Sequence, residues 1–481
     1  MHTKKRTKII STIGPSTQNE DIIRQLILEG VNVFRFNLKH NDLDWHITNI
    51  NKVRRIAKDL NIYIGIMLDL QGPDIRIGDV FPNPLILQKG DKVIFGTVKK
   101  GKKDNLPFIQ LEQKFVEKIK IDQEIVIDDG NFIFKALEDS NTDSVTCVVE
   151  EANGDLLPNK GVFFPNLNIH VPALSPKDKD NLKIAEEVHP EFLALSFVRT
   201  GDDVRTLKQE VLKRGLEETK IISKVETKLA IQNIDDILKE SDGIMVARGD
   251  LGVELHLEAV PAIQKKLIKK SRKNTKFVIV ATQMLKSMVT NPNPTRAEIS
   301  DVANASYDLA DAVMLSEETA VGKYPIRAVK IMAKTLRYNE VESLKFSKSA
   351  NPIFSTHDVT EAIVISADNI QRDLERVITP KAFLVLTESG RTAELLSALR
   401  PLIPIFSVSQ KDSVSRHLSL CWGVLPFSTK FKKTTDSSVK AVIQMLKKKG
   451  ILKKGDALIV ISGQNIGVTG QTDSLRVLVT T

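Results

Sequence analysis

The stretch KIISKVETKLAIQNIDDILKESDGIMVARGDLGVEL, residues 220–255, decides the fold and points to the site. Two short apolar runs in it each end in charged residues, and a polar segment of helical length joins them. Lys224 and Glu226 are two residues apart, so on a strand their side chains face the same side. The second run breaks into Arg-Gly-Asp at 248–250. We expect an ammonium, two carboxylates and a glycine turn to converge where adjacent parallel strands end. Such an arrangement suits a divalent metal and an anionic substrate; ordinary solvated charge at two strand ends is the alternative.

Strand-like and helix-like segments alternate on both sides of this stretch. Continuous apolar runs are typical of parallel strands that are covered on both faces. Besides the two runs above, the predicted strands are Thr7–Gly14, Val33–Leu38, Tyr63–Leu70, Phe192–Phe197, Phe277–Met284 and Asp311–Ser316. The predicted helices cover residues 21–29, 41–60, 178–188, 202–214, 259–273, 324–339 and a segment that begins near 296. Eight βα units predict a (β/α)8 TIM barrel, whose active sites lie at the C-terminal ends of the strands.

Two other regions depart from this alternation. Residues 78–168 carry short β-like runs between Gly, Asp and Asn turns, which predicts a small all-β domain inserted into a barrel of residues 1–77 and 169–344. The basic loop Lys99–Asn105 is interpreted as a solvated hairpin tip, with polyphosphate contact as the alternative. Residues 345–481 predict a separate open α/β domain. Its predicted helices are 359–376, 391–399 and two more, and its predicted strands are FLVLT, PIFSVS, DALIVISG and LRVLVT.

Composition argues against several classes of protein. The net charge of +9 comes from dispersed basic residues and aromatic residues make up only 5%, so nothing supports a nucleic-acid module. Cys147 and Cys421 lie far apart in the sequence and imply no disulfide framework. The first residues lack an apolar signal core, and no apolar run is long enough to span a membrane. We expect a soluble, cytoplasmic protein with neither nucleic-acid nor membrane partners.

Polar residues collect at the predicted C-terminal ends of the barrel strands. In strand order they are Thr12, Arg35 and Asn37, Asp69, Ser196, Lys224 and Glu226, Asp250, Thr282, and Ser316. One polar strand end means little, but a barrel brings all eight ends together, so this register predicts a single polar site.

These segments resemble the successive motifs of pyruvate kinases along essentially the whole chain. The barrel motifs are TKIISTIGPST, NVFRFN, LDLQGPDIRIG, IISKVE, MVARGDLGVE, ATQML, NPTRAEISDVANA and MLSEETAVGKYP, and the C-terminal ones are TESGRTA and SGQNIGVTGQTDSLRV. The resemblance implies a barrel with a β lid inserted after strand three, a C-terminal α/β regulatory domain and a homotetramer.

The resemblance also implies a phosphotransferase that converts phosphoenolpyruvate and ADP to pyruvate and ATP with Mg²⁺ or Mn²⁺, the last step of glycolysis. Positioning and electrostatic stabilisation carry most of such a reaction. Glu226 and Asp250 would hold the metal, and Lys224, Arg35 and Thr282 would be catalytic. Substrate contacts would come from Arg35, Lys224, Thr282, Ser196 and the turn Ala247, Arg248, Gly249 and Asp250. Nucleotide contacts would come from Asn37, His40, Arg76 and Lys177, with Thr12 and Pro15 near the adenosine.

One region departs from the family pattern. The family usually reads Asn-Phe-Ser-His and Asp-Thr-Lys-Gly-Pro-Glu where this chain reads NLKH at 37–40 and DLQGPD at 69–74. The Asn, Ser, Asp and Thr of the family supply oxygens to K⁺. Here Asn37 and Asp69 remain, whereas Lys39 and Leu70 replace the other two. The hypothesis is activity without K⁺, with Lys39 as the substitute charge; a merely weakened K⁺ site is the alternative.

The C-terminal motif Thr387, Ser389, Gly390, Arg391 and Thr392 resembles the family's phosphate-binding effector loop. A helix start of this kind is a natural anion site, although a plain helix cap is the alternative. Glu388 argues against a heavily phosphorylated sugar close by.

Two rival functions remain open at this point. Another metal-dependent, enolate-handling barrel enzyme would explain the acidic pair but not the insert or the C-terminal domain. A non-catalytic paralogue would explain Lys39 and Leu70 but not the retained phosphoryl-transfer residues.

Overall fold

The barrel strands form where the apolar runs lie. The structure, a computed structural model, describes residues 5–73, 75–97, 106–128, 130–141, 143–165, 171–346, 356–374, 377–464 and 470–481. Within these ranges, eight parallel strands close a barrel in the order β1-β17-β16-β15-β14-β13-β3-β2. Their bounds are β1 Lys8–Thr12, β2 Val33–Asn37, β3 Gly65–Asp69, β13 Phe192–Leu195, β14 Lys220–Val225, β15 Gly243–Ala247, β16 Phe277–Ala281 and β17 Ala312–Leu315. The predicted TIM barrel is confirmed.

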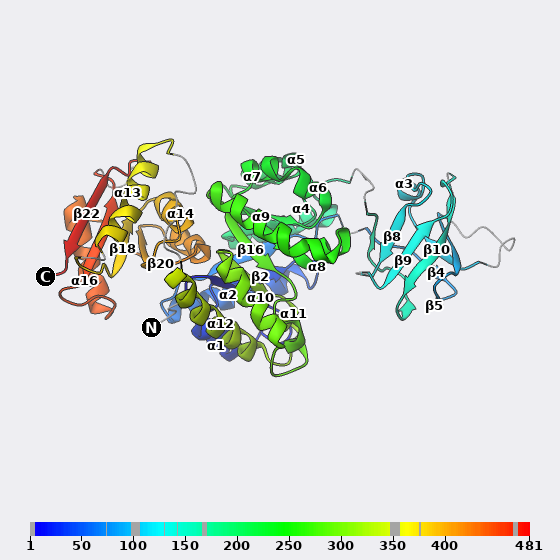
Figure 1. Ribbon diagram of the computed structural model, residues 1–481, viewed down its shortest axis with the longest axis horizontal. Helices are drawn as coiled ribbons and strands as arrows, with labels where there is room; N and C mark the ends of the chain where they lie inside the picture. The colour runs from blue at the N-terminus through cyan, green and yellow to red at the C-terminus, as the bar shows by residue number, and fades with distance from the viewer. Residues whose placement is uncertain are drawn as a thin grey trace.

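Helices cover the outside of this barrel (Figure 1). They are α1 Glu20–Glu29, α2 Leu43–Asp59, α4 Pro176–Val188, α5 Gly201–Lys213, α6 Lys228–Gln232, α7 Ile234–Glu240, α8 Arg248–Glu254, α9 Val260–Lys273, α10 Arg296–Tyr307, α11 Glu317–Ala320 and α12 Pro325–Phe346, with short 3₁₀ turns at Leu257–Ala259 and Lys286–Val289. The polar segment after β14 is two short helices rather than one, because Asn233 ends α6 and begins α7. The last helix of the barrel runs to Phe346, beyond the predicted end at 339.

The inserted all-β region lies between β3 and β13 and projects from the barrel beyond α8 (Figure 1). Its elements are β4 Val80–Phe81, β5 Leu85–Ile86, β6 Lys92–Gly96, β7 Phe108–Gln110, α3 Gln113–Val116, β8 Glu124–Ile127, β9 Phe132–Ala136, β10 Ser144–Ala152, β11 Asp155–Leu156 and β12 Val162–Phe163. It packs around its own core, which includes Phe95, Phe115 and Phe134. The basic loop Lys99–Asn105 lies outside the described residues. We call this region the lid.

The C-terminal domain contains a five-stranded sheet, as far as the described residues extend, in the order β20-β19-β18-β21-β22. Its elements are α13 Val359–Leu374, β18 Ala382–Leu386, α14 Arg391–Ala398, β19 Ile405–Ser409, α15 Asp412–His417, a 3₁₀ turn at Leu418–Leu420, β20 Val424–Ser428, α16 Thr435–Lys448, β21 Ala457–Ser462 and β22 Ser474–Val479. The strand β20 is absent from the elements predicted for this domain. Pro426 lies in its middle, and proline is tolerated there because β20 is an edge strand that, among the strands of the described ranges, pairs with β19 alone.

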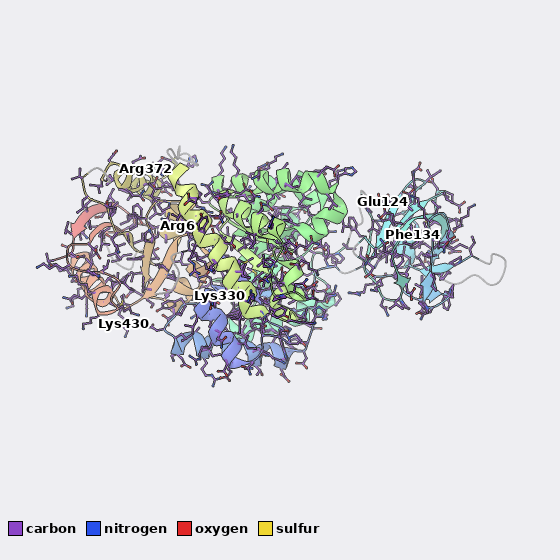
Figure 2. All side chains as sticks on the ribbon, turned by 60° about the horizontal axis from the view of Figure 1, so that its bottom comes forward. Arg6, Glu124, Phe134, Lys330, Arg372 and Lys430 are labelled. Atoms are coloured by element: carbon purple, nitrogen blue, oxygen red, sulfur yellow. The ribbon has the colours of Figure 1, made fainter. Side chains whose placement is uncertain are left out.

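The C-terminal domain closes the N-terminal end of the barrel. Inward-facing barrel residues such as Met67, Phe192 and Met245 belong to the same hydrophobic cluster as Leu418 and Leu420. Arg6, labelled in Figure 2 at this junction, donates from its guanidinium to two backbone carbonyls of the C-terminal domain. The carboxyl end of the barrel is therefore left to face the lid. No helix in the described ranges is long and apolar enough to cross a membrane.

Candidate active site

A cavity of about 670 Å³ lies at the carboxyl end of the barrel and is lined by both the barrel and the lid. Glu226 and Asp250 contribute carboxylates to its wall, and Lys39 contributes an ammonium. The lid contributes Asp128 and Lys160, whose side chains form an ion pair of 2.9 Å. This cavity is where the strand-end rule places the active site of a TIM barrel.

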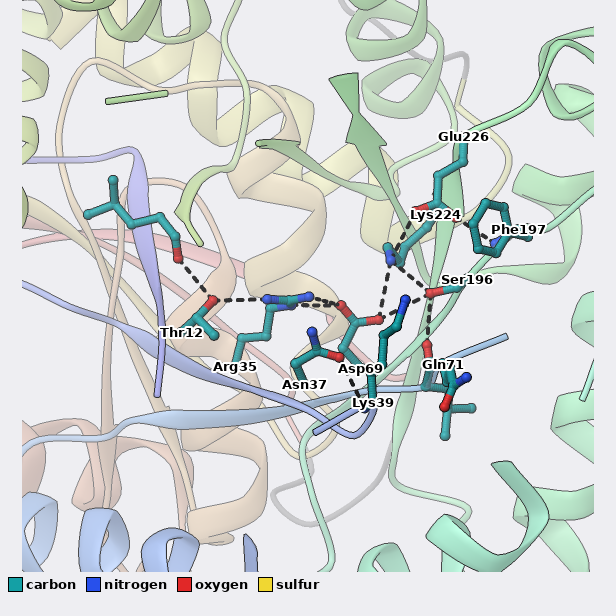
Figure 3. Close-up of polar contacts among 12 residues, drawn as sticks. Thr12, Arg35, Asn37, Lys39, Asp69, Gln71, Ser196, Phe197, Lys224 and Glu226 are labelled. Atoms are coloured by element: carbon teal, nitrogen blue, oxygen red, sulfur yellow. Dashed lines mark hydrogen bonds and ion pairs between the residues drawn. The ribbon is translucent and has the colours of Figure 1, made fainter. Parts of the chain in front are cut away.

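Beside the cavity, side chains from four strands meet in one buried polar cluster, drawn in Figure 3. Asp69 accepts from Arg35 Nε at 2.6 Å and lies 3.5 Å from Lys224 Nζ. Lys224 Nζ also lies 2.9 Å from Glu226 and donates to Ser196 Oγ at 2.7 Å. Two cations and two carboxylates therefore share one small buried volume, and β14 positions Lys224 so that it bridges both carboxylates.

The charges in this cluster shift one another's titration. Burial would raise the pKa of Asp69, but the charges of Lys224 and Arg35 outweigh burial and hold that pKa below its ordinary value. Burial would lower the pKa of Lys224, but Asp69 and Glu226 raise it, so this ammonium stays charged. Burial and the charge of Asp250 raise the pKa of Glu226 to about 7, although Lys224 acts in the opposite direction. The site thus has a fixed cation beside a carboxylate that takes up a proton easily.

Two residues near the cluster have left-handed backbone conformations that are rare for their side chains. Phe197 has a φ of 53°, and its N–H donates to Glu226 Oε2 at 2.6 Å. Thr282 has a φ of 68°, and its hydroxyl accepts from the N–H of Gly249 at 2.7 Å. A β-branched or aromatic residue in this region stores strain, and such strain concentrates at functional sites.

The predicted substrate turn opens a short helix, α8, with Ala247 as its N-cap. The side chain of Arg248 points away from the cavity: its guanidinium pairs with Asp301 at 2.6 Å and donates to the carbonyl of Thr282 at 2.8 Å. The Arg248 side chain therefore stabilises the turn. The turn can then contact a ligand through the backbone of residues 247–250.

The two predicted metal ligands fit a divalent cation. Glu226 and Asp250 line the same cavity, and their mutual repulsion adds to the raised pKa of Glu226. No cluster of three or more His, Cys, Asp or Glu residues suited to a metal occurs in the described part of the chain. Mg²⁺ needs no such cluster, since it binds through one or two carboxylates together with substrate oxygens and water.

Comparison with known proteins agrees with this geometry. The family described as "Pyruvate kinase, barrel domain" matches residues 4–329, and "Pyruvate kinase, alpha/beta domain" matches residues 328–478. The chain belongs to the pyruvate kinase family. It is 38% identical to the pyruvate kinase of Clostridium acetobutylicum, over 99% of both chains. It is 37% identical to that of Buchnera aphidicola, over 98% of both. A solved pyruvate kinase structure from Cryptosporidium parvum has a TM-score of 0.89 and 31% identity, covering 99% of this chain and 96% of the other.

Membership of the pyruvate kinase family makes the chain a phosphotransferase of glycolysis and excludes an unrelated enolate-handling barrel. The nucleotide residues expected for this family fall into two groups. Arg76 lines the cavity, and His40 lies close enough to Lys39, Lys177 and Arg76 that their charges add to partial burial in lowering its pKa. This crowding of positive charge suits a polyphosphate.

The other three, Thr12, Pro15 and Asn37, do not line the cavity. Thr12 is buried and its hydroxyl accepts from Arg35 at 3.1 Å, whereas Pro15 is exposed. Asn37 accepts the N–H of Lys39 at 3.2 Å through its side-chain oxygen.

Lys39 and Leu70, the two residues that depart from the expected pattern, differ in where their side chains lie. Leu70 is buried in the hydrophobic layer between the barrel strands and their helices, so its side chain is directed away from the cavity. Lys39 lines the cavity, and Figure 3 draws its side chain directed toward Asp69 and Ser196.

The predicted effector loop begins α14, with Gly390 as N-cap. Thr387 Oγ1 accepts the N–H of Gly390 at 3.0 Å, and Thr392 Oγ1 lies 2.8 Å from Thr472 Oγ1. Arg391 pairs with two acidic residues of the α13 region, Asp358 at 3.2 Å and Glu361 at 3.3 Å. Ser389 lines two cavities between the C-terminal domain and the barrel. Most side chains of the loop thus already have partners within the protein.

Sequence reasoning missed several residues of the site. Lys160 and Asp128 lie in the lid, and nothing in their local sequence tells which lid surface faces the barrel. Arg199 and Lys228 follow β13 and β14 and line the cavity. Both residues come just after predicted barrel strands, and this position was the sequence feature that could have identified them as site residues.

Proposed function

We propose that this chain transfers the phosphoryl group of phosphoenolpyruvate to ADP with a divalent cation, Mg²⁺ or Mn²⁺, and without K⁺. One observation carries the proposal: Lys224, whose side chain is only 13% exposed, is charged between Asp69 and Glu226, beside the cavity that Glu226 and Asp250 line. A fixed ammonium of this kind stabilises negative charge as it moves across a phosphoryl group, because the buried site needs no reorganisation.

The substrate side of the proposal uses the residues around Lys224. Lys224 contacts the transferring phosphoryl group and the enolate oxygen that forms when it leaves. Arg35, held rigid by Asp69 and Thr12, adds a second positive charge for the phosphoryl group. The N–H groups at the start of α8 contact the substrate carboxylate, and the Thr282 hydroxyl beside them lies on the path of the proton that converts enolate to pyruvate.

The divalent cation would be held by Glu226 and Asp250. When bound, it supplies positive charge that neutralises the carboxylate and phosphoryl oxygens of the substrate. Ser196 accepts from Lys224 and donates its one hydroxyl proton to the Leu70 carbonyl at 2.8 Å, with Asp69 Oδ1 at 3.4 Å as the weaker acceptor, and so keeps this cluster aligned with the substrate.

The nucleotide would lie on the side of His40, Arg76 and Lys177, where the positive charges gather. Asn37, Thr12 and Pro15 complete this side of the proposal, with the last two toward the adenosine. A polyphosphate suits this region, because an anion offsets the repulsion among the cations.

Independence of K⁺ rests on Lys39 and Leu70. Leu70 offers no oxygen and packs in the core, whereas Lys39 brings a positive charge to the cavity next to Asp69. The test measures turnover in K⁺-free buffer and again with added KCl. Rates that agree within a few-fold support the proposal, and a large activation by KCl contradicts it.

Three further properties complete the proposal. The enzyme acts as a homotetramer in the cytoplasm, where the other steps of glycolysis supply its substrate. The loop that begins α14 binds a small phosphorylated effector after Arg391 releases Asp358 and Glu361. The proposal includes neither a nucleic-acid partner nor a membrane partner.

The deciding experiment is a coupled assay of pyruvate formation. Pyruvate should appear only with ADP, phosphoenolpyruvate and a divalent cation together. Lys224→Met should lower its rate about a thousandfold, and pyruvate formation without ADP would contradict the proposal.

A further inference from the structure

Asp178 is a buried carboxylate to which the catalytic scheme assigns no role. It lies in the first turn of α4 and is completely inaccessible to solvent. Its Oδ1 accepts the N–H groups of Gln71 at 2.8 Å and Gly72 at 3.4 Å. Its Oδ2 accepts the N–H of Ser175 at 3.0 Å and the hydroxyl of Ser175 at 2.6 Å. An ordinary capping box explains the Ser175 bonds but leaves those from Gln71 and Gly72 unexplained.

These donors lie on the two segments that connect barrel and lid. Gln71 and Gly72 follow β3 where the chain leaves for the lid, and Ser175 lies where the chain returns to α4. Both connections therefore meet at the two oxygens of one carboxylate. Arg199 holds the returning segment at a second point, since its guanidinium donates to the Val171 carbonyl at 2.6 Å.

The outgoing segment is also packed against the catalytic cluster. Gly72 has a φ of 73°, and a Cβ at this position would come within 2.9 Å of the Ser196 side chain. Ser196 Oγ donates to the Leu70 carbonyl at 2.8 Å, just before the hydrogen-bonded amides. A displacement of Gln71 and Gly72 would therefore disturb Ser196, the partner of Lys224.

The first two turns of α4 also hold the loop that carries Lys39. Lys177 Nζ donates to the Lys39 carbonyl at 3.0 Å, and Asn181 Nδ2 donates to the Leu38 carbonyl at 3.2 Å. The start of α4 thus joins three segments: the Lys39 loop, the exit to the lid and the return from it.

We propose that Asp178 is a positioning residue that ties both connections to the lid to the start of α4 and thereby aligns the nucleotide side of the site with Lys224. It touches no reacting atom and acts through Gln71, Gly72 and the position of Lys177. The kinetic part of this inference rests on the proposed function, whereas its structural part does not.

Asp178→Asn tests the kinetic part. The amide has nearly the same shape but replaces one acceptor by a donor that would face N–H groups, and it removes the charge that strengthens the remaining bonds. The KM for ADP should rise about tenfold, because the groups that Asp178 holds lie on the nucleotide side. The KM for phosphoenolpyruvate should stay within about twofold, because Thr282 follows β16 and Gly249 lies in α8, on other elements of the barrel. The disturbance of Ser196, the partner of Lys224, should instead appear as a lower kcat. Thr434→Ala, which removes a capping box of the same kind in the C-terminal domain, is the matched control and should change neither KM.

Amide hydrogen exchange of the unmodified protein tests the structural part. Gln71 and Gly72 lie outside any strand or helix, yet their amides should exchange as slowly as those of β3. Exchange at the rate of an open loop overturns the inference. Equal rises in both KM values, or an unchanged KM for ADP in a folded Asp178→Asn protein, also overturn it. Absence of all pyruvate formation would contradict the proposed function while the exchange experiment still decides the role of Asp178.

Discussion

Metal affinity should fall steeply between pH 8 and pH 6, because Glu226 must be ionised to bind a divalent cation. Burial, helped by the charge of Asp250, raises the pKa of this carboxyl to about 7. About nine-tenths of the sites are then ionised at pH 8 and about one-tenth at pH 6, so the apparent affinity should drop about tenfold. Mn²⁺ binding to the substrate-free protein, followed by titration calorimetry at several pH values, measures this drop directly.

Titration of Glu226 should also change the stability of the metal-free protein. This stability should fall as the pH rises, whereas metal affinity rises with pH. The pKa of Glu226 is higher in the folded chain than its ordinary 4.5, so the folded state binds this proton more tightly than the unfolded state. The stability that the proton confers is complete below pH 4.5 and is lost as the pH rises toward 7. Bound metal should reverse this loss, since it favours the ionised carboxylate.

Two variants show whether Glu226 is the titrating group. Glu226→Gln should bind Mn²⁺ weakly at every pH and lose the dependence. Glu254→Gln is the matched control, because Glu254 lines the same cavity but accepts the N–H of Lys228 at 3.0 Å. Affinity that stays constant from pH 8 to pH 5 in the unmodified protein would refute the reasoning, as would a midpoint that moves in Glu254→Gln.

The remaining predictions concern charge at three places. The double change Lys39→Ser, Leu70→Thr should make turnover depend on K⁺, measured as the ratio of rates with and without KCl; a ratio that stays near one counts against the role of Lys39. Lys224→Met should lower kcat about a thousandfold and leave the chain folded, as judged by circular dichroism; a loss below tenfold would dismiss Lys224 as the central cation. Velocity curves against phosphoenolpyruvate should shift on addition of AMP or a sugar phosphate and should coincide in Arg391→Ala; curves that already coincide in the unmodified protein remove the effector site.

The barrel could be predicted from the sequence because its strands are covered on both faces. Each one is a continuous apolar run, and the helices between them carry clear periodicity. The C-terminal strand β20 could not be predicted, because Pro426 interrupts the apolar pattern. Proline is acceptable in β20 because this strand lies at the edge of the sheet. The segment after β14 divides into two helices at Asn233. This division could not be predicted, because a polar stretch of helical length does not show where a helix ends.

The candidate site could be predicted in part. Lys224 and Glu226 meet as expected, since two residues on one strand face the same side whatever the rest of the fold does. Arg248 belongs to the turn whose backbone is predicted to bind the substrate, whereas its guanidinium pairs with Asp301, a partner 53 positions away. No local pattern could have shown that choice.

The sequence by itself determined the element types, the strand-end position of the polar residues and the presence of Lys39 and Leu70 at the two positions that depart from the family pattern. These follow from backbone periodicity and residue chemistry, which act over a few residues. Only the tertiary structure decided that Asp69 is shared by Arg35 and Lys224, and that Asp178 joins both connections to the lid. Such contacts depend on the order of the strands in the barrel and on which distant loops lie next to each other. A buried charge must be paired, and the packing of the whole chain decides which partners lie close enough to pair with it.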